Sequence, residues 1–159
     1  MGAGETGKTN SFMEENGYHF SYTNYSETDE NSVPNGRIVT GPKRITKAGM
    51  YRYCWPGCLT VMYDAEFVGL IQIADIQKNN DYAMWLTICK RADCYLLDEL
   101  LAKYRKRSGS ISRHGYLTLI WWHYKMFREA ERKNPITAFV LTVQNMFFGV
   151  IKKIGYVKG

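Results

Sequence analysis

The first residues of the sequence match a phosphate-binding motif. Gly2 to Thr9 read GAGETGKT, which satisfies the pattern G-x-x-x-x-G-K-[ST] at every position. Such a loop binds phosphate because a buried strand leads into a Gly-rich turn and the free N–H groups of the following helix point at the phosphate oxygens. No strand precedes the motif in this sequence, and the best partner strand for magnesium, LTVMYD, ends at Asp64 and is a poor match. We expect a cloning, fusion or gene-model remnant rather than ATP or GTP hydrolysis.

A carboxylate near a helix start is the second group that could do chemistry. In the stretch NNDYAMWL, Asp81 comes directly before an aromatic-rich amphipathic turn. An acid in this position is stabilised by the helix dipole without any chemistry attached. The same acid at the edge of a cleft could act as a general base. Spacing alone favours the structural role.

The cysteines and histidines do not form a metal-binding pattern. Cys54 and Cys58 make a C-x₃-C pair, but no second pair follows, and the three histidines do not supply an H-x₃₋₅-H pair. The N-terminus is polar and lacks the apolar run of a signal peptide, so we expect an intracellular protein with reduced thiols. We expect no metal site in this chain and four buried, apolar thiols.

Turn residues and apolar residues predict a mixed α/β chain in the first half. Residues 1–10 are small and polar and are expected to be an unstructured lead-in, before a helix that ends at Asn16 and Gly17. A strand at 18–26, a turn-rich loop and a strand at 37–41 predict a hairpin. Next along the chain we expect a short helix at 46–53 and a buried strand at 58–64.

The second half is expected to hold a helix, a strand and two longer helices. Asn80 is a suitable N-cap for the first helix. The pattern at 93–105 fits either a strand or a helix, and we favour a strand because a Ser/Gly-rich stretch follows it. Helices are expected at 116–133 and from Pro135 to about Ile154.

The last expected helix carries one apolar stripe whose partner the sequence leaves open. Thr142, Gln144 and Asn145 interrupt its apolar run, which falls short of the roughly 20 residues that span a bilayer. Core packing and a place in a membrane interface are both compatible with the pattern. The stripe consists of Ile136, Phe139, Val140, Val143, Phe147, Val150, Ile151 and Ile154.

Charge divides the chain into two unequal parts. The 159 residues are 45% hydrophobic, which is enough for the core of one domain. Residues 1–99 hold 9 Lys/Arg and 13 Asp/Glu, a net charge of −4, whereas residues 100–159 hold 12 Lys/Arg and 2 Asp/Glu, a net charge of +10. The last third therefore favours an anionic partner such as phosphate, nucleic acid or an acidic lipid surface, or else is a solvated basic face.

Four stretches, taken in order and spacing, resemble the C-terminal half of family 2 glycosyltransferases. They are FMEENGYHFSYTNYSETDENSVPNG with GPKRIT, then WPGCLTVMYD, NNDYAMWL and CYLLDELLAKYRKRSGSIS. Members of this family include non-processive enzymes of bacterial surface polysaccharide and teichuronic acid synthesis. The resemblance begins near residue 11 and implies an α/β fold, the C-terminal part of a GT-A-like mixed sheet with a hairpin. Residues 11–113 would be its acceptor-side, catalytic-base half, and 114–159 a basic tail of two amphipathic helices.

The resemblance gives Asp81 a catalytic role. The family has a Glu-Asp pair ahead of a Tyr and a Trp-Leu, and here Asn80 replaces the first member of that pair. Asp81 would deprotonate the acceptor hydroxyl as it attacks the anomeric carbon in an inverting displacement. By the same resemblance Trp55, Asn80 and Trp85 would line the acceptor side. Core packing of Trp55 is an equal alternative.

The segment YRKRSGSIS resembles the flexible edge that closes over the donor diphosphate in this family. Arg105 matches a family Arg, whereas Arg107 falls where many relatives have a His that joins the metal site. Arg cannot ligate a metal, but it can neutralise a diphosphate leaving group. The resemblance therefore implies donor-diphosphate binding by Arg105 and Arg107, and the residues alone also allow a solvated basic run.

The nucleotide-binding half of the family has no counterpart in this sequence. No D-x-D motif, which would hold a divalent metal (Mg or Mn) and the donor diphosphate, occurs in it. We therefore expect no metal on this chain and little or no transferase activity from it alone. The complete enzyme would use a nucleotide-sugar donor and a glycan or lipid-linked acceptor. It would be cytoplasmic and peripheral on the inner face of the cell membrane, against an anionic surface.

A basic nucleic-acid-binding module is the alternative from another functional class. The basic last third and aromatics such as Trp121, Trp122 and Tyr124 permit it. No nucleic-acid-binding motif supports it, and these aromatics fall at helical, core-like spacing. We therefore expect no nucleic-acid partner.

Overall fold

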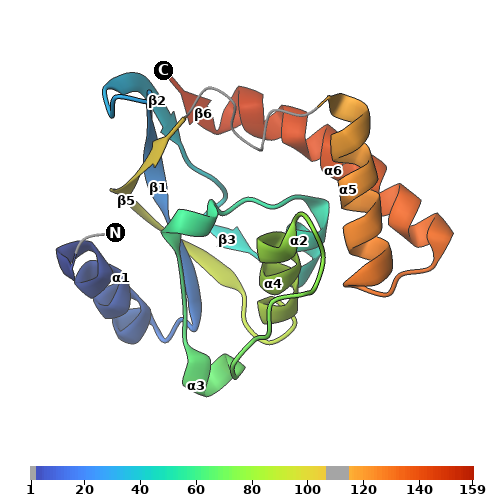
Figure 1. Ribbon diagram of the computed structural model, residues 1–159. Coiled ribbons are helices and arrows are strands. Elements are labelled where there is room, and N and C mark those ends of the chain that lie inside the picture. Colours follow the sequence, from blue (N-terminus) through green and yellow to red (C-terminus); the bar gives the residue numbers. More distant parts are fainter. Residues whose placement is uncertain (1–2, 107–114) are drawn as a thin grey trace.

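A mixed sheet with helices around it forms the protein, as the α/β prediction requires. The computed structural model describes residues 3–106 and 115–159, and Figure 1 shows the arrangement. Within those residues the strands run in the order β3-β5-β1-β2-β6, and β4 also pairs with β1. The strands are β1 (Phe20–Thr28), β2 (Pro34–Val39), β3 (Arg44–Ile45), β4 (Val61–Tyr63), β5 (Cys94–Arg105) and β6 (Val157–Lys158).

In the part of the chain that the structure describes, seven helical segments connect or cover these strands. α1 precedes the sheet, α2 to α4 lie between β3 and β5, and α5 and α6 form the C-terminal part (Figure 1). They are α1 (Ala3–Asn16), α2 (Lys47–Arg52), the 3₁₀ turn η1 (Cys58–Thr60), α3 (Ala65–Val68), α4 (Asn80–Ile88), α5 (Tyr116–Glu129) and α6 (Pro135–Gly155).

Strand β1 is the centre of the sheet. β5 runs parallel to it along one edge, with Ser21 opposite Tyr95 and Thr28 opposite Arg105. On its other edge β4 pairs with residues 20–22 and β2 pairs with residues 25–28, both antiparallel. The expected hairpin of β1 and β2 is confirmed. The strand expected at 93–105 is also confirmed, because 94–105 pairs with residues 21–28 of β1 instead of forming a helix.

Three local expectations are wrong. Residues 3–10 are helical as the start of α1 rather than an unstructured lead-in, because Thr9 is buried and Lys8 pairs with Glu99 at 2.7 Å, which attaches the helix to the sheet. The N-cap of α4 is Asn79, in the left-handed region with φ 61°, one residue before the expected Asn80. The stretch 58–64 is a 3₁₀ turn followed by a three-residue strand rather than one buried strand.

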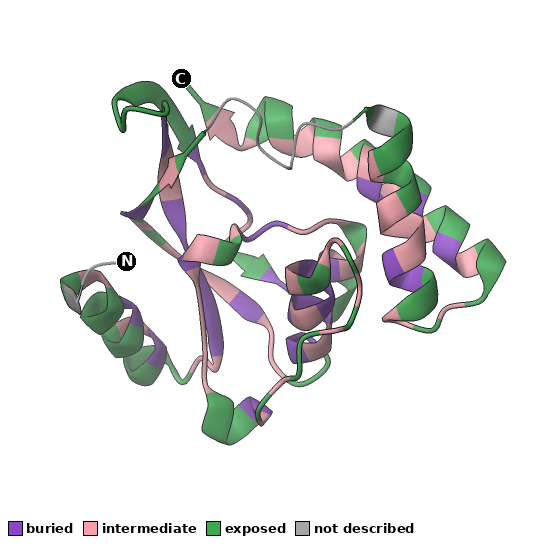
Figure 2. Ribbon diagram, viewed as in Figure 1, coloured by how far each residue is buried: buried purple, intermediate pink, exposed green. Residues whose placement is uncertain are grey.

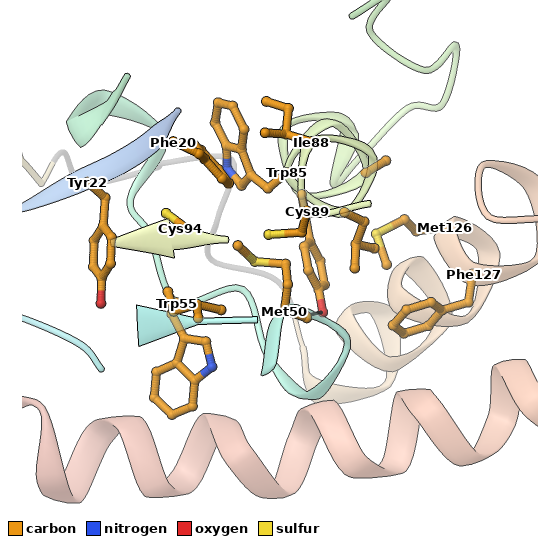
Figure 3. Packing of buried hydrophobic residues seen from close by; sticks show 14 of the residues in the cluster. Phe20, Tyr22, Met50, Trp55, Trp85, Ile88, Cys89, Cys94, Met126 and Phe127 are labelled. Atoms are coloured by element: carbon orange, nitrogen blue, oxygen red, sulfur yellow. Dashed lines mark hydrogen bonds between the residues drawn. The ribbon is translucent and has the colours of Figure 1, made fainter. Parts of the chain in front are cut away.

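The core lies between the sheet, α2, α4 and the C-terminal helices. Figure 3 shows Phe20 and Tyr22 from β1 and Trp85 from α4 in this cluster, and Trp55 projects toward α6. Figure 2 shows that burial is concentrated on the sheet and α4, whereas the outer surfaces of α5 and α6 are largely exposed. The core therefore consists mainly of residues from the sheet and α4, and α6 contributes to it with one side only.

Helix α6 begins with a complete N-cap. The Asn134 side-chain oxygen accepts a hydrogen bond from the Thr137 N–H at 2.8 Å, and Pro135 occupies the first turn, where its missing N–H costs nothing. The expected start at Pro135 is therefore confirmed, and the helix ends at Gly155.

Replacing Asn134 by Ala should lower the free energy of unfolding by about 1 kcal/mol, because the Thr137 N–H loses its acceptor. The matched variant Asn134→Asp keeps an acceptor oxygen and should stay close to wild type. Urea unfolding of the three proteins measures both values. Equal stability of the Ala and Asp variants would contradict the cap.

Candidate functional site

Asp81 lies in the first turn of α4. Its backbone N–H donates to the Asn80 side-chain oxygen at 2.9 Å, and its Oδ1 accepts from the Tyr82 N–H at 2.8 Å. These local bonds orient the carboxylate, and no hydrogen bond to Oδ2 is found among the described residues. The exposed Asn80 and half-exposed Asp81 thus leave one oxygen able to accept a proton from a bound molecule.

The neighbouring Tyr82 connects α4 to two other helices. Its hydroxyl donates to the Met50 carbonyl in α2 at 2.7 Å and accepts from the Asn145 side-chain amide in α6 at 2.7 Å. All three residues are buried, and burial raises the pKa of the Tyr82 hydroxyl well above its usual value. The start of α4, and Asp81 with it, is therefore held against α2 and α6 by neutral hydrogen bonds.

Trp55 packs in the core rather than presenting its ring to a sugar. Its side chain is only 6% exposed, and its indole lies edge-on to Phe148 and Tyr156 from the C-terminal segment. The indole N–H donates to the Gly49 carbonyl at 3.2 Å, and the Lys152 ammonium donates to the Trp55 carbonyl at 2.6 Å. Of the two roles that the sequence left open for Trp55, core packing is the one found, because α6 covers the ring.

Trp85, the other aromatic residue assigned to the acceptor side, is also in the core. It is 7% exposed and its ring centroid lies 6.0 Å from that of Phe20. Trp85 lies one helical turn after Asp81 in α4, and its side chain faces the sheet. Its burial therefore corrects the expectation that Trp85 lines the acceptor site, and Asn80 is the assigned acceptor residue that remains exposed.

Two thiols lie within electrostatic range of Asp81. Burial, and then the charge of Asp81, raise the pKa of the Cys58 thiol and that of the Cys54 thiol. Cys58 is exposed, so the expectation of four buried thiols is wrong at this position, while Cys89 and Cys94 are buried as expected. Asp81 is thus close enough to the loop that carries Cys54 and Cys58 for its charge to disfavour both thiolates.

The expected diphosphate-binding arginines are only partly described. Arg105 is exposed at the end of β5, opposite Thr28. Arg107 lies outside the described residues. Beside Arg105, Lys106 pairs with the nearly buried Glu27 at 2.6 Å, which fixes the end of the strand. No contact joins Arg105 to Asp81, so their shared role stays a prediction.

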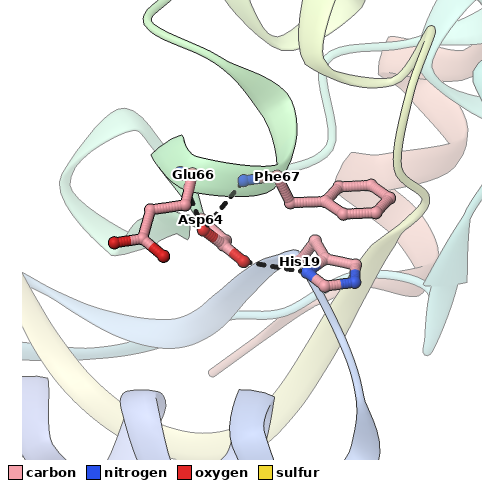
Figure 4. Close-up of polar contacts among 4 residues, drawn as sticks. All are labelled: His19, Asp64, Glu66 and Phe67. Atoms are coloured by element: carbon pink, nitrogen blue, oxygen red, sulfur yellow. Dashed lines mark hydrogen bonds and ion pairs between the residues drawn. The ribbon is translucent and has the colours of Figure 1, made fainter.

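A histidine–aspartate pair fastens the start of β1 to α3, a contact that sequence reasoning missed. His19 Nδ1 lies 2.9 Å from Asp64 Oδ2, and the His19 ring stacks on Phe67. Figure 4 shows this pair and the neighbouring Phe67 ring. Asp64 Oδ1 also accepts from the N–H groups of Glu66 and Phe67. The bond from His19, followed by these N–H groups, lowers the pKa of Asp64. The two residues are 45 positions apart, so no local pattern could have paired them.

The phosphate-loop match is not a loop in the structure. Residues 3–9 lie within α1, so the Gly-rich turn that would present free N–H groups does not form there. Asp64 was the nearest candidate for a magnesium-binding residue at a strand end. In the structure it is the N-cap of α3, and its side chain accepts hydrogen bonds from backbone N–H groups of that helix. Among the residues that the structure describes, no group of three His, Cys, Asp or Glu side chains could hold a metal ion.

Two curated glycosyltransferases are similar to this chain. The chain is 33% identical over 146 residues to a protein named as a teichuronic acid biosynthesis glycosyltransferase, TuaG of Bacillus subtilis (strain 168), covering 90% of this chain and 57% of TuaG. It is 34% identical over 113 residues to the UDP-Glc:alpha-D-GlcNAc-diphosphoundecaprenol beta-1,3-glucosyltransferase WfaP of Escherichia coli, covering 69% of this chain and 43% of WfaP.

The similarity to glycosyltransferases that the motifs indicated is thereby confirmed. The chain spans about half the length of these curated relatives. No family model matches the sequence, and no solved structure matches it.

Alkylation of Cys58 gives a test of the arrangement around Asp81. Replacing Asp81 by Asn removes a negative charge that disfavours the thiolate, so Cys58 should react with iodoacetamide at pH 8 about twofold or more faster. Peptide mass spectrometry measures the rate at each thiol.

The matched control for this experiment is Asp75→Asn, which removes the same charge from an exposed loop position. It should leave the rate at Cys58 unchanged. An equal effect of both variants, or no effect of Asp81→Asn, would show that Asp81 and Cys58 are not neighbours.

Proposed function

We propose that this chain is the acceptor-side, catalytic-base part of an inverting glycosyltransferase. The complete enzyme would move a sugar from a nucleotide sugar to a glycan or lipid-linked acceptor. The observation that carries this proposal is the similarity to two glycosyltransferases over most of the chain. The position of Asp81, half-exposed at the start of α4 beside the loop 54–58, supports it.

In the proposed reaction Asp81 accepts the proton of an acceptor hydroxyl. The hydroxyl oxygen forms a bond to the anomeric carbon while the bond from that carbon to the diphosphate oxygen breaks, and the nucleoside diphosphate leaves with the electron pair. A sugar hydroxyl is a poor nucleophile, so a carboxylate within hydrogen-bond reach lowers the barrier by removing its proton in the transition state. Oδ2 of Asp81 is the oxygen available for this step, and the exposed Asn80 amide could orient the acceptor.

Donor binding would depend mainly on a nucleotide-binding half like the part of the relatives that this chain does not cover. Arg105 and Arg107 would neutralise charge on the diphosphate. The divalent metal (Mg or Mn) that the resemblance implies finds no ligand cluster among the described residues, so no step of the proposal passes through it. Without the nucleotide-binding half, Asp81 has no donor to act with, and little or no transfer is expected from these residues alone.

The proposed site of action is the cytoplasmic face of the cell membrane, where the protein would be peripheral. The name of WfaP specifies a lipid-linked acceptor for that protein. An acceptor of this class for the present chain would require the Asp81 surface to lie near lipid headgroups. The basic last third of the chain fits an anionic surface.

The test joins this chain, from residue 11 onward, to the N-terminal segment of TuaG that it does not cover. Release of nucleoside diphosphate from a panel of nucleotide sugars, measured with and without membrane extract, reports turnover. Asp81→Asn should lower the rate at least about 100-fold, because the general base is lost while the shape is kept. Asp75→Asn, an exposed carboxylate outside the site, should keep the parent rate.

Two results would contradict the proposal. An active chimera whose Asp81→Asn variant keeps the parent rate would remove Asp81 as the base. A chimera that folds, as shown by cooperative unfolding, and turns over no nucleotide sugar in the panel with membrane extract present would argue against the assignment as a transferase half.

A further inference from the structure

The apolar stripe of α6 faces outward. Seven large apolar side chains on this helix are each more than half exposed, while only Ala138, Thr142 and Asn145 are buried. At 100° per residue the seven lie on one side of the helix, with Asn145 opposite. For these seven residues the core-packing role that the sequence allowed is therefore wrong, whereas Ile151, the eighth residue of the predicted stripe, packs against the core. The exposed residues are Ile136, Phe139, Val140, Val143, Phe147, Val150 and Ile154.

Helix α5 extends the same apolar surface. Leu117, Ile120 and Trp121 are exposed at one-turn spacing. Together with Tyr124 they line a groove of about 310 Å³, whose other wall is Phe139 and Thr142 of α6. Because one groove joins residues of both helices, the two apolar surfaces are continuous. We refer to them together as the outer face, the eleven residues Leu117, Ile120, Trp121, Tyr124, Ile136, Phe139, Val140, Val143, Phe147, Val150 and Ile154.

Basic side chains lie at both ends of the outer face. Arg128 and Arg132 are exposed near the turn between α5 and α6, and Lys153 and Lys158 are exposed at the other end. Residues 115–159 hold seven Lys/Arg and two Asp/Glu. An apolar centre with cationic ends matches a leaflet of anionic lipids, in which headgroup phosphates meet the cations and acyl chains meet the centre.

The inner side of α6 excludes a membrane-spanning arrangement of the folded protein. By length and composition α6 could cross a bilayer, so the expectation that its apolar run is too short to span one is wrong; it is the one such helix among the residues described. However, its Asn145 amide bonds to Tyr82, its Lys152 ammonium bonds to the Trp55 carbonyl, and burial lowers the pKa of Lys152. Lipid around α6 would require breaking these bonds and burying their polar groups in hydrocarbon.

We propose that the outer face inserts into an anionic lipid leaflet, with α5 and α6 lying along the plane of the membrane. A second copy of the chain is the less suitable occupant, because pairing two such faces would bring their basic ends together. This inference deepens the membrane location given under the proposed function. It rests on the geometry of α5 and α6 and needs no transferase activity.

The arrangement would place the acceptor surface next to lipid. Phe148 of α6 and Tyr156, directly after its end, pack on Trp55, and the Lys152 ammonium donates to the Trp55 carbonyl. The loop 54–58 and Asp81 are therefore attached to the inner side of the helix whose outer side meets the membrane. A lipid-linked acceptor held in the same leaflet could present its sugar to Asp81 without leaving the bilayer.

The test is cosedimentation of the full 159-residue chain with vesicles. The vesicles are phosphatidylcholine alone or with about one-third phosphatidylglycerol. The wild-type chain should bind the anionic vesicles more tightly, and added salt should weaken the binding. The double variant F139E/F147E, which changes exposed outer-face residues, should lose at least about tenfold in partitioning. The matched control L70E/I73E changes two exposed apolar residues away from α5 and α6 and should bind as wild type does.

A second measurement separates the flat arrangement from a spanning one. Trp121, read as the difference between wild type and W121F, should be quenched by lipids brominated on their acyl chains, and alkaline carbonate should release the protein from membranes. Resistance to carbonate would overturn the flat arrangement.

Three further results would overturn membrane binding by the outer face. They are no binding to either vesicle, equal loss of binding in both double variants, and a dimer in solution that F139E/F147E dissociates. None of these results bears on whether Asp81 is a base, so the proposed function is tested separately.

Discussion

The hydrogen bond from the Asn145 amide to the Tyr82 hydroxyl is the interaction on which the arrangement of this protein depends. It connects α6, the longest helix, to the turn of α4 that carries Asp81, and Tyr82 passes the connection to α2 through the Met50 carbonyl. A buried amide is costly unless it is paired, so the bond from Asn145 Nδ2 favours the register that brings Asn145 to Tyr82, while Asn145 Oδ1 has no hydrogen-bond partner among the described residues. That register also places Lys152 under the Trp55 carbonyl.

A helix held in this way has two sides with different partners. The inner side carries polar groups that match specific acceptors and donors in the core, which is unusual for a helix so apolar overall. The outer side carries bulky apolar residues that are each more than half exposed, with basic residues at both ends. The inner contacts fix the rotation of the helix, and this rotation decides which residues face outward. The position of the proposed base and the orientation of the proposed lipid-binding face therefore both depend on how α6 packs against α4.

Much of the fold could be predicted because short stretches of sequence determine where its helices and turns begin and end. Asn16 and Gly17 end α1, Pro135 begins α6, and the turn-rich stretch between two β-rich segments makes the hairpin. The sequence predicted the apolar stripe of α6 correctly but could not say which way it faces, since periodicity identifies a face and not its partner. Asn145 was read from the sequence as an interruption of the stripe. In the structure it lies on the opposite side of α6 and bonds to Tyr82 in the core, so the stripe faces outward.

The site was predicted less completely, for a related reason. Asp81 was found through its resemblance to a family motif, and its half-exposed position is compatible with that role. Trp55 and Trp85 were assigned to the acceptor side by resemblance to the family, yet whether a ring is exposed or covered depends on elements that are remote in sequence. The His19–Asp64 pair could not be predicted from local sequence patterns either, because its two residues are 45 positions apart.

A double-mutant cycle on Tyr82 and Asn145 tests the central claim most directly. The variants are Tyr82→Phe, Asn145→Leu and the double substitution, and urea unfolding gives the free energy of each. If the bond holds α6 in its register, the two substitutions should be coupled by about 1–2 kcal/mol. Additive effects, with a coupling near zero, would show that α6 is held by other contacts and would contradict the account.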